Sequence, residues 1–152
     1  MEKGKRRKIL NLVKEKLESK LFFGTVLLQA PSQAVPSATG LPSVFIFRED
    51  ELMERLTNTE KRSMFGVGFV LYVEADTDIE LVKADAQDVL EDALIELQID
   101  AAFTALAVQI LVQSASSGPL ALAPLGLGAG VFPPYGAIRI SAVVMFDYQA
   151  VT

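Results

Sequence analysis

The sequence predicts one domain that contains both helices and strands, of class α/β (α+β). We expect a mixed or antiparallel sheet of about five strands flanked by two main helices. The length of 152 residues suits a single domain, and 51% of the residues are hydrophobic, which is enough for a core. Apolar residues recur at helical spacing in two segments and at strand spacing in several others. We therefore expect residues 1–152 to form one domain, with a long apolar loop at 114–136.

The first element is expected to be a helix over residues 5–20. Apolar residues recur there at intervals of three and four with charged residues between them: Ile9, Leu10, Val13 and Leu17. Five apolar or alternating segments predict strands: 21–28, 41–47, 64–74, 107–113 and 137–148. A second helix lies between the third and fourth strands. The predicted order is therefore one helix, three strands, one helix and two strands.

The charged residues 48–63 fit either a short helix or the extended tip of a long hairpin, and we favour the hairpin. In the strand that follows, alternation places Val67 and Phe69 on one face and Gly66 and Gly68 on the other. The two glycines leave room for a close neighbour, either the first helix or another backbone.

The second helix is predicted to begin after Thr77, because Glu80 follows three residues later in a capping-box pattern. Its apolar positions continue to Leu97. Residues 74–100 carry ten acids against the single basic Lys83. The acidic side of this helix is then either a solvated surface or a functional acidic wall.

The composition narrows the possible chemistry. The chain has no His, Cys or Trp, which excludes imidazole bases, thiol nucleophiles, disulfides and the common zinc sites. The glycines at 126–130 precede Pro133, Pro134 and a strand, not the helix that a phosphate-binding loop requires. Catalysis would need carboxylates, so Asp85, Asp88 and Asp92 remain as a candidate set if they are buried. We expect no enzyme activity, no metal and no cofactor.

The first 20 residues hold eight of the 14 basic residues. Among these, Lys5, Arg6, Arg7 and Lys8 could contact nucleic-acid phosphates, or they could belong to a solvated terminus. No continuous apolar stretch follows them, so we expect synthesis in the cytoplasm without a secretory signal. The uncharged stretch 101–138 contains polar residues, Gly and Pro, so we expect no transmembrane helix.

The segment 114–136 carries no charge and four prolines. A loop of this length and apolarity is expected to contact another subunit or to fold over its own sheet. We predict subunit contacts at its large side chains: Leu120, Leu122, Leu125, Leu127, Val131, Phe132 and Tyr135.

The order of these features resembles the tail terminator, or tail completion, proteins of long-tailed bacteriophages. The resemblance rests on the basic first helix, the strand at 41–47 with Pro42 at its entry, the charged excursion, the alternating strand, the acidic helix and a closing strand that ends in Phe146 and Tyr148. It spans nearly the whole chain and concerns architecture, since this family has no catalytic signature.

The resemblance implies a structural virion protein without catalytic activity. It implies a homohexameric ring that caps the tail tube, ends its polymerisation and joins the tail to the head or neck. The implied partners are the tail tube protein and a head-completion or neck/connector protein, with DNA passing through the lumen without specific binding. The implied location is the head-proximal end of the virion tail, after assembly in the host cytoplasm.

We expect polar partner contacts on the charged excursion, at Arg48, Glu51, Arg55 and Arg62. Another head–tail connector ring, such as a neck or head-closure protein, has the same sequence pattern. A nucleic-acid-binding module that uses the basic start is a second alternative. A carboxylate enzyme is a third alternative, and it would need Asp85, Asp88 or Asp92 to be buried in a cleft.

Overall fold

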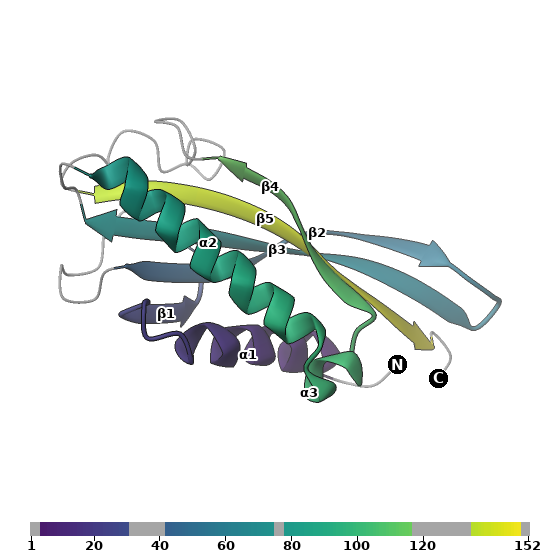
Figure 1. The fold of residues 1–152 in the computed structure, drawn as a ribbon. Helices are drawn as coiled ribbons and strands as arrows, with labels where there is room; N and C mark the ends of the chain where they lie inside the picture. Colours follow the sequence, from purple (N-terminus) through teal and green to yellow (C-terminus); the bar gives the residue numbers. More distant parts are fainter. Residues whose placement is uncertain (1–3, 31–41, 75–77, 117–134, 150–152) are drawn as a thin grey trace.

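The fold is a five-stranded sheet with the helices gathered on one face (Figure 1). The computed structural model describes residues 4–30, 42–74, 78–116 and 135–149. Its elements are α1 (Lys5–Glu18), β1 (Thr25–Leu28), β2 (Ser43–Arg55), β3 (Glu60–Glu74), α2 (Ile79–Gln98), α3 (Ala101–Thr104), β4 (Gln109–Ser116) and β5 (Tyr135–Gln149). The predicted fold class and order of elements are confirmed, with the short α3 added before β4.

The sheet is mixed, with strand order β1-β2-β3-β5-β4. β1 runs parallel to β2, and the other three pairs are antiparallel. β3 is central and pairs with β5 along its whole length. β1 covers only the first four residues of β2, where its last residue, Leu28, lies opposite Ile46. Within the described residues, the edge of β2 beyond Ile46 therefore has no strand on the β1 side.

The charged excursion is a hairpin, as favoured, and the helix alternative is wrong. β2 continues through the charged residues to Arg55, well beyond the predicted end at residue 47. The turn is closed by Glu60, whose carbonyl accepts hydrogen bonds from the Leu56 and Thr57 amides at 2.9 and 3.1 Å. The Thr57 hydroxyl also accepts from the Glu60 amide at 2.9 Å.

Other predicted boundaries shift as well, three of them at the start of an element. The first strand begins at residue 25 instead of 21, because residues 19–22 form a turn in which Leu21 is fully exposed. The second helix begins at Ile79, and Asp78 at its N-cap makes no side-chain hydrogen bond to the helix. The predicted capping residue Thr77 lies outside the described residues. The fourth strand begins at residue 109 because α3, capped by the Asp100 carboxylate, is followed by a turn in which the Leu106 and Ala107 amides donate to the Phe103 carbonyl.

The main core lies between the helices and one face of the sheet. Apolar side chains of α1 and α2, such as Ile9 and Leu90, pack against alternate residues of β3 and β5, such as Phe69 and Ile140. Burying each large side chain contributes about 1.5–3 kcal/mol. On the opposite face, Phe45, Val70 and Tyr72 form a smaller buried cluster, with the Phe45 and Tyr72 rings edge to face at 5.6 Å.

Candidate functional site

The β2–β3 hairpin extends beyond the helices at one end of the sheet (Figure 1). Leu52, Met53 and Leu56 are exposed on it, at 66%, 59% and 39% of their surface. The Tyr148 hydroxyl of β5 lies 3.1 Å from the Met53 sulfur, so β5 supports the hairpin on one side. An exposed apolar group on a supported extension is a candidate protein contact.

An ion pair fixes the base of this hairpin to α1. The Arg6 guanidinium donates from Nε to Glu51 Oε1 at 2.8 Å and from its terminal nitrogen to Oε2 at 2.5 Å. It also lies over the rings of Phe146 and Tyr148, at 5.1 and 5.8 Å. The hydrogen bonds from Arg6 hold the pKa of Glu51 below its usual value, and they raise the pKa of Arg6.

The two glycines of β3 accommodate β2, and not the first helix. A bulge in β2 places two residues opposite Gly66, and a Cβ there would lie 2.5 Å from the Asp50 carbonyl oxygen. A Cβ at Gly68 would lie 2.5 Å from the Phe47 ring and 3.0 Å from the Glu49 carboxyl carbon. Gly66 and Gly68 leave this face of β3 without side chains. The Glu49 side chain therefore extends across β3, and its carboxylate pairs with Arg139 of β5 at 2.6 Å.

Three of the four predicted contact residues on the hairpin take part in internal ion pairs. Glu51 binds Arg6, and Arg62 donates to both carboxylate oxygens of Asp147, at 2.7 and 3.1 Å. Arg48 lies 3.4 Å from Glu51 and over the Phe65 ring, with its side chain 56% exposed. Arg55 is exposed near the tip. The structure thus brings Arg48 and Glu51 together and places Arg55 and Arg62 farther along the hairpin.

The predicted apolar contacts fall mostly outside the described residues. These are Leu120, Leu122, Leu125, Leu127, Val131 and Phe132. Tyr135 is the first residue of β5, where its backbone pairs with Glu74.

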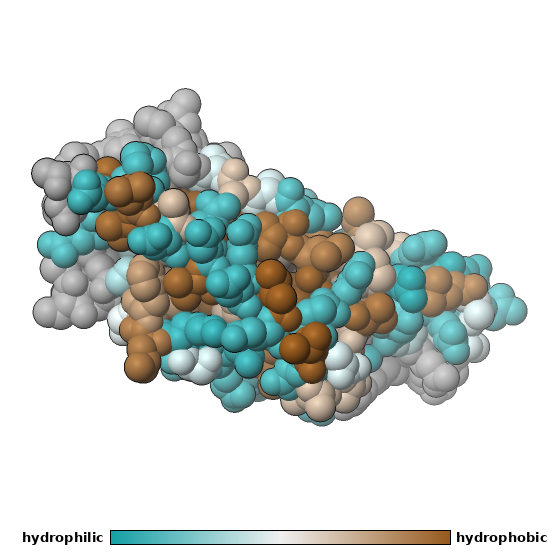
Figure 2. Space-filling view, viewed as in Figure 1, coloured by the Kyte–Doolittle hydropathy of each residue, from teal (hydrophilic) through white to brown (hydrophobic). Residues whose placement is uncertain are grey.

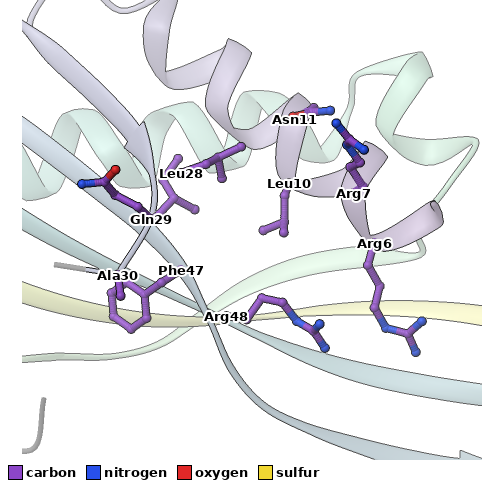
Figure 3. A pocket seen from close by; sticks show the side chains of 10 residues that line it. Arg6, Arg7, Leu10, Asn11, Leu28, Gln29, Ala30, Phe47 and Arg48 are labelled. Atoms are coloured by element: carbon purple, nitrogen blue, oxygen red, sulfur yellow. The ribbon is translucent and has the colours of Figure 1, made fainter.

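A groove of about 740 Å³ lies between the first half of α1, the end of β1 and β2 (Figure 3). Leu10, Leu28 and Phe47 supply its apolar surface, and Arg6 and Arg48 lie side by side at one end. Arg7 and Asn11 border it from α1. None of the described residues that line the groove is acidic. Sequence reasoning missed this site, because its residues come from three separate segments.

The basic start of the chain is partly used inside the molecule. Lys5 donates to the Asp147 carbonyl at 2.8 Å. Lys20 pairs with Glu96, and the Lys16 ammonium lies 3.9 Å from the Asp100 carboxylate. Glu96 of α2, Asp100 at the start of α3 and Glu51 of the hairpin therefore balance several of these positive charges, which weakens the nucleic-acid alternative.

The acidic side of α2 faces solvent. Asp85, Asp88 and Asp92 are all exposed, so the burial that the carboxylate-enzyme alternative requires is absent at these positions. In the described ranges, no cluster of three or more Asp, Glu, His or Cys residues is arranged to bind a metal ion. None of the described helices combines the length and apolarity needed to cross a bilayer.

Comparison with protein-family models gives no match, and comparison with curated proteins gives no match either. Among solved structures, the fold is similar to a sheath/tube terminator, in its extended state, from PVC, an extracellular contractile injection system studied by cryo-EM. The TM-score is 0.49 and the sequence identity 12%, over 96% of this chain and 58% of that chain. This chain thus spans less than two thirds of that protein. A terminator is also the class of protein that the sequence pattern resembles.

Proposed function

We propose that this chain is a structural tail-capping protein. It forms a homohexameric ring on the head-proximal end of a phage-type tail tube, ends polymerisation of the tube and joins the tail to the head or neck. The order of elements along the sequence supports this kind of assembly, and the exposed surfaces described above support a role in protein contacts. The proposed role includes no chemical reaction.

The β2–β3 hairpin is the observation that carries the proposal. An ion pair to α1 fixes its base, an ion pair to β5 holds its outer part, and that part exposes Leu52, Met53 and Leu56. A cap must carry a surface that matches the last layer of the tube, and a braced extension binds with little loss of conformational entropy. We assign the hairpin to this contact, with the exposed Arg55 as a polar partner.

The proposed partners are further copies of the chain, the tube protein on one side of the ring, and a head-completion or neck protein on the other. The net charge of −5 suits a ring through which DNA passes without specific binding. Assembly takes place in the host cytoplasm, and the finished protein is part of the virion.

The test combines light scattering with a capping assay. Six chains of 16.5 kDa give a ring of about 99 kDa. Adding the protein to polymerising tube protein of the same particle should shorten the tubes seen by electron microscopy. A variant with serine at positions 52, 53 and 56 should form the ring but leave tube length unchanged. A Leu111→Ser variant, which changes an exposed apolar residue on β4, is the matched control that should still cap.

A monomer that neither binds nor shortens tubes would contradict the proposal. Binding to a head or neck protein without any effect on the tube would assign the chain to another head–tail connector ring. Salt-sensitive DNA binding that is lost on neutralising Lys5, Arg6, Arg7 and Lys8 would favour the nucleic-acid module.

A further inference from the structure

The solvent side of α2 carries one continuous stripe of six residues, which we call the outer stripe. Its members follow one another at intervals of four, three, four, three and four residues, a spacing that keeps them on one side of a helix. They are Leu81, Asp85, Asp88, Asp92, Ile95 and, just after the helix, Ile99.

The outer stripe combines exposed apolar residues with unpaired charge. Leu81, Ile95 and Ile99 are 66%, 65% and 82% exposed. Among the described residues, none forms an ion pair with the three aspartates between them. Figure 2, which views this side of the molecule, shows hydrophobic and hydrophilic surface alternating along the helix. Leucine and isoleucine at such exposure are unfavourable in water and are typical of a contact surface.

The groove beside α1 has the complementary composition. Its middle is apolar, and three arginines border it (Figure 3). Within the described part of the chain, Glu51 binds both Arg6 and Arg48, and Glu49 binds Arg139. The groove is therefore a positively charged site with an apolar floor on a protein of net charge −5.

One subunit cannot bring these two surfaces together. α2 packs on β3, β4 and β5, toward one edge of the sheet, whereas the groove lies at the opposite edge, beside β1 and β2. Two different patches at opposite edges form the head-to-tail type of interface that closes into a ring.

We propose that the outer stripe of one subunit docks in the groove of the next, with the aspartates facing Arg7 and Arg48 and the flanking apolar side chains covering the floor. This inference rests on the proposed ring and specifies how its subunits join. A second copy is a better occupant than nucleic acid, because the apolar floor offers nothing to a phosphate backbone and the outer stripe offers both matching components.

Cysteine cross-linking tests the contact directly, since the chain contains no cysteine. Asn11→Cys places a thiol at the groove and Asp88→Cys places one on the outer stripe, and both positions are exposed. The two variants, one carrying a size tag, are mixed and oxidised. Disulfides between the two different variants should form at least several-fold faster than in the matched control, which combines Glu54→Cys on the hairpin with Asp88→Cys.

A charge exchange gives a second, independent measurement. Arg7→Glu with Arg48→Glu should raise the concentration at which half of the ring dissociates by about tenfold or more, as should Asp85→Lys with Asp88→Lys. Combining all four changes in one chain restores opposite charges and should restore the ring. Circular dichroism on each variant shows whether it is folded.

The outcomes separate this contact from the proposed function. A stable ring of six chains that cross-links no faster than the control and tolerates the charge reversals would overturn the contact and leave the capping role intact. Failure of the wild-type chain to form a ring or bind tubes would overturn both. Loss of duplex-DNA binding in the Arg7/Arg48 variant, with the ring unchanged, would reassign the groove to phosphates.

Discussion

Replacing Glu51 with glutamine should show how strongly the hairpin depends on its link to α1. The Glu51 side chain is 8% exposed and accepts two charge-assisted hydrogen bonds from Arg6, whose side chain is 21% exposed. Hydrogen bonds to charged groups contribute about 1.5–3 kcal/mol, and breaking a fully buried ion pair costs about 3–5 kcal/mol. Because Arg6 keeps some contact with water, we expect Glu51→Gln to lower the free energy of unfolding by about 2–3 kcal/mol.

The assay is urea unfolding followed by circular dichroism at pH 7 and at pH 3–5. The lowered pKa of Glu51 means that the folded protein binds its proton less readily than the unfolded chain does. The pair therefore stabilises the fold fully above the ordinary glutamate pKa, and this contribution is lost as pH falls through the lower, folded value. Wild type should lose more stability on acidification than Glu51→Gln.

The matched control is Glu54→Gln, an exposed glutamate three residues farther along the same strand. We expect that change to alter the free energy of unfolding by less than about 0.5 kcal/mol. Equal effects of the two substitutions, or an unchanged acid sensitivity in Glu51→Gln, would refute the reasoning.

Three further predictions follow from the packing. Gly66→Ala should destabilise the fold by about 2 kcal/mol or more in the same urea assay, because its Cβ would lie 2.5 Å from the backbone oxygen of Asp50. Tyr72→Phe should raise stability by about 1–2 kcal/mol, since the Tyr72 hydroxyl is buried and none of the described residues hydrogen-bonds to it. Spectrophotometric titration should find the phenol pKa raised by burial to about 12. Lys20→Ala removes an ion pair to the exposed Glu96 and should change the midpoint of thermal unfolding by only a degree or two.

The sequence predicted best the elements whose pattern is set by the core. In β3, Val67 and Phe69 alternate with small residues because one face meets the helices, so the strand could be recognised from its spacing alone. The far half of β2 shows no such alternation, because both of its faces are largely polar or exposed. Its backbone pairs with β3, and ion pairs with residues distant in sequence, such as Arg6, hold it in place; these ion pairs have no local signal in the sequence.

The candidate site was predictable only in part. The spacing of Asp85, Asp88 and Asp92 indicated one helix face. The sequence alone did not show that Leu81 and Ile95 beside them are exposed, and their exposure is what marks a contact surface. The groove joins α1, β1 and β2, and an open edge on β2 exists only because β1 ends at Leu28. Where β1 ends relative to β2 depends on the tertiary structure, and the periodicity of the sequence does not predict it.

The position of β5 between β3 and β4 sets the order in which the subunit can be completed. β3 is synthesised long before β5, yet its second edge pairs only with β5, and β4 has no other neighbour among the described strands. Until β5 is made, the nascent chain carries two unpaired strand edges, and the main core lacks the side chains that β5 supplies, such as Ile140 and Phe146. Closing the sheet is thus the slow, non-local step, and it also joins the end of β5 to the hairpin through Asp147 and Arg62. A subunit gains its braced hairpin only when its fold is complete, so maturation of the monomer comes before any contact that the hairpin makes.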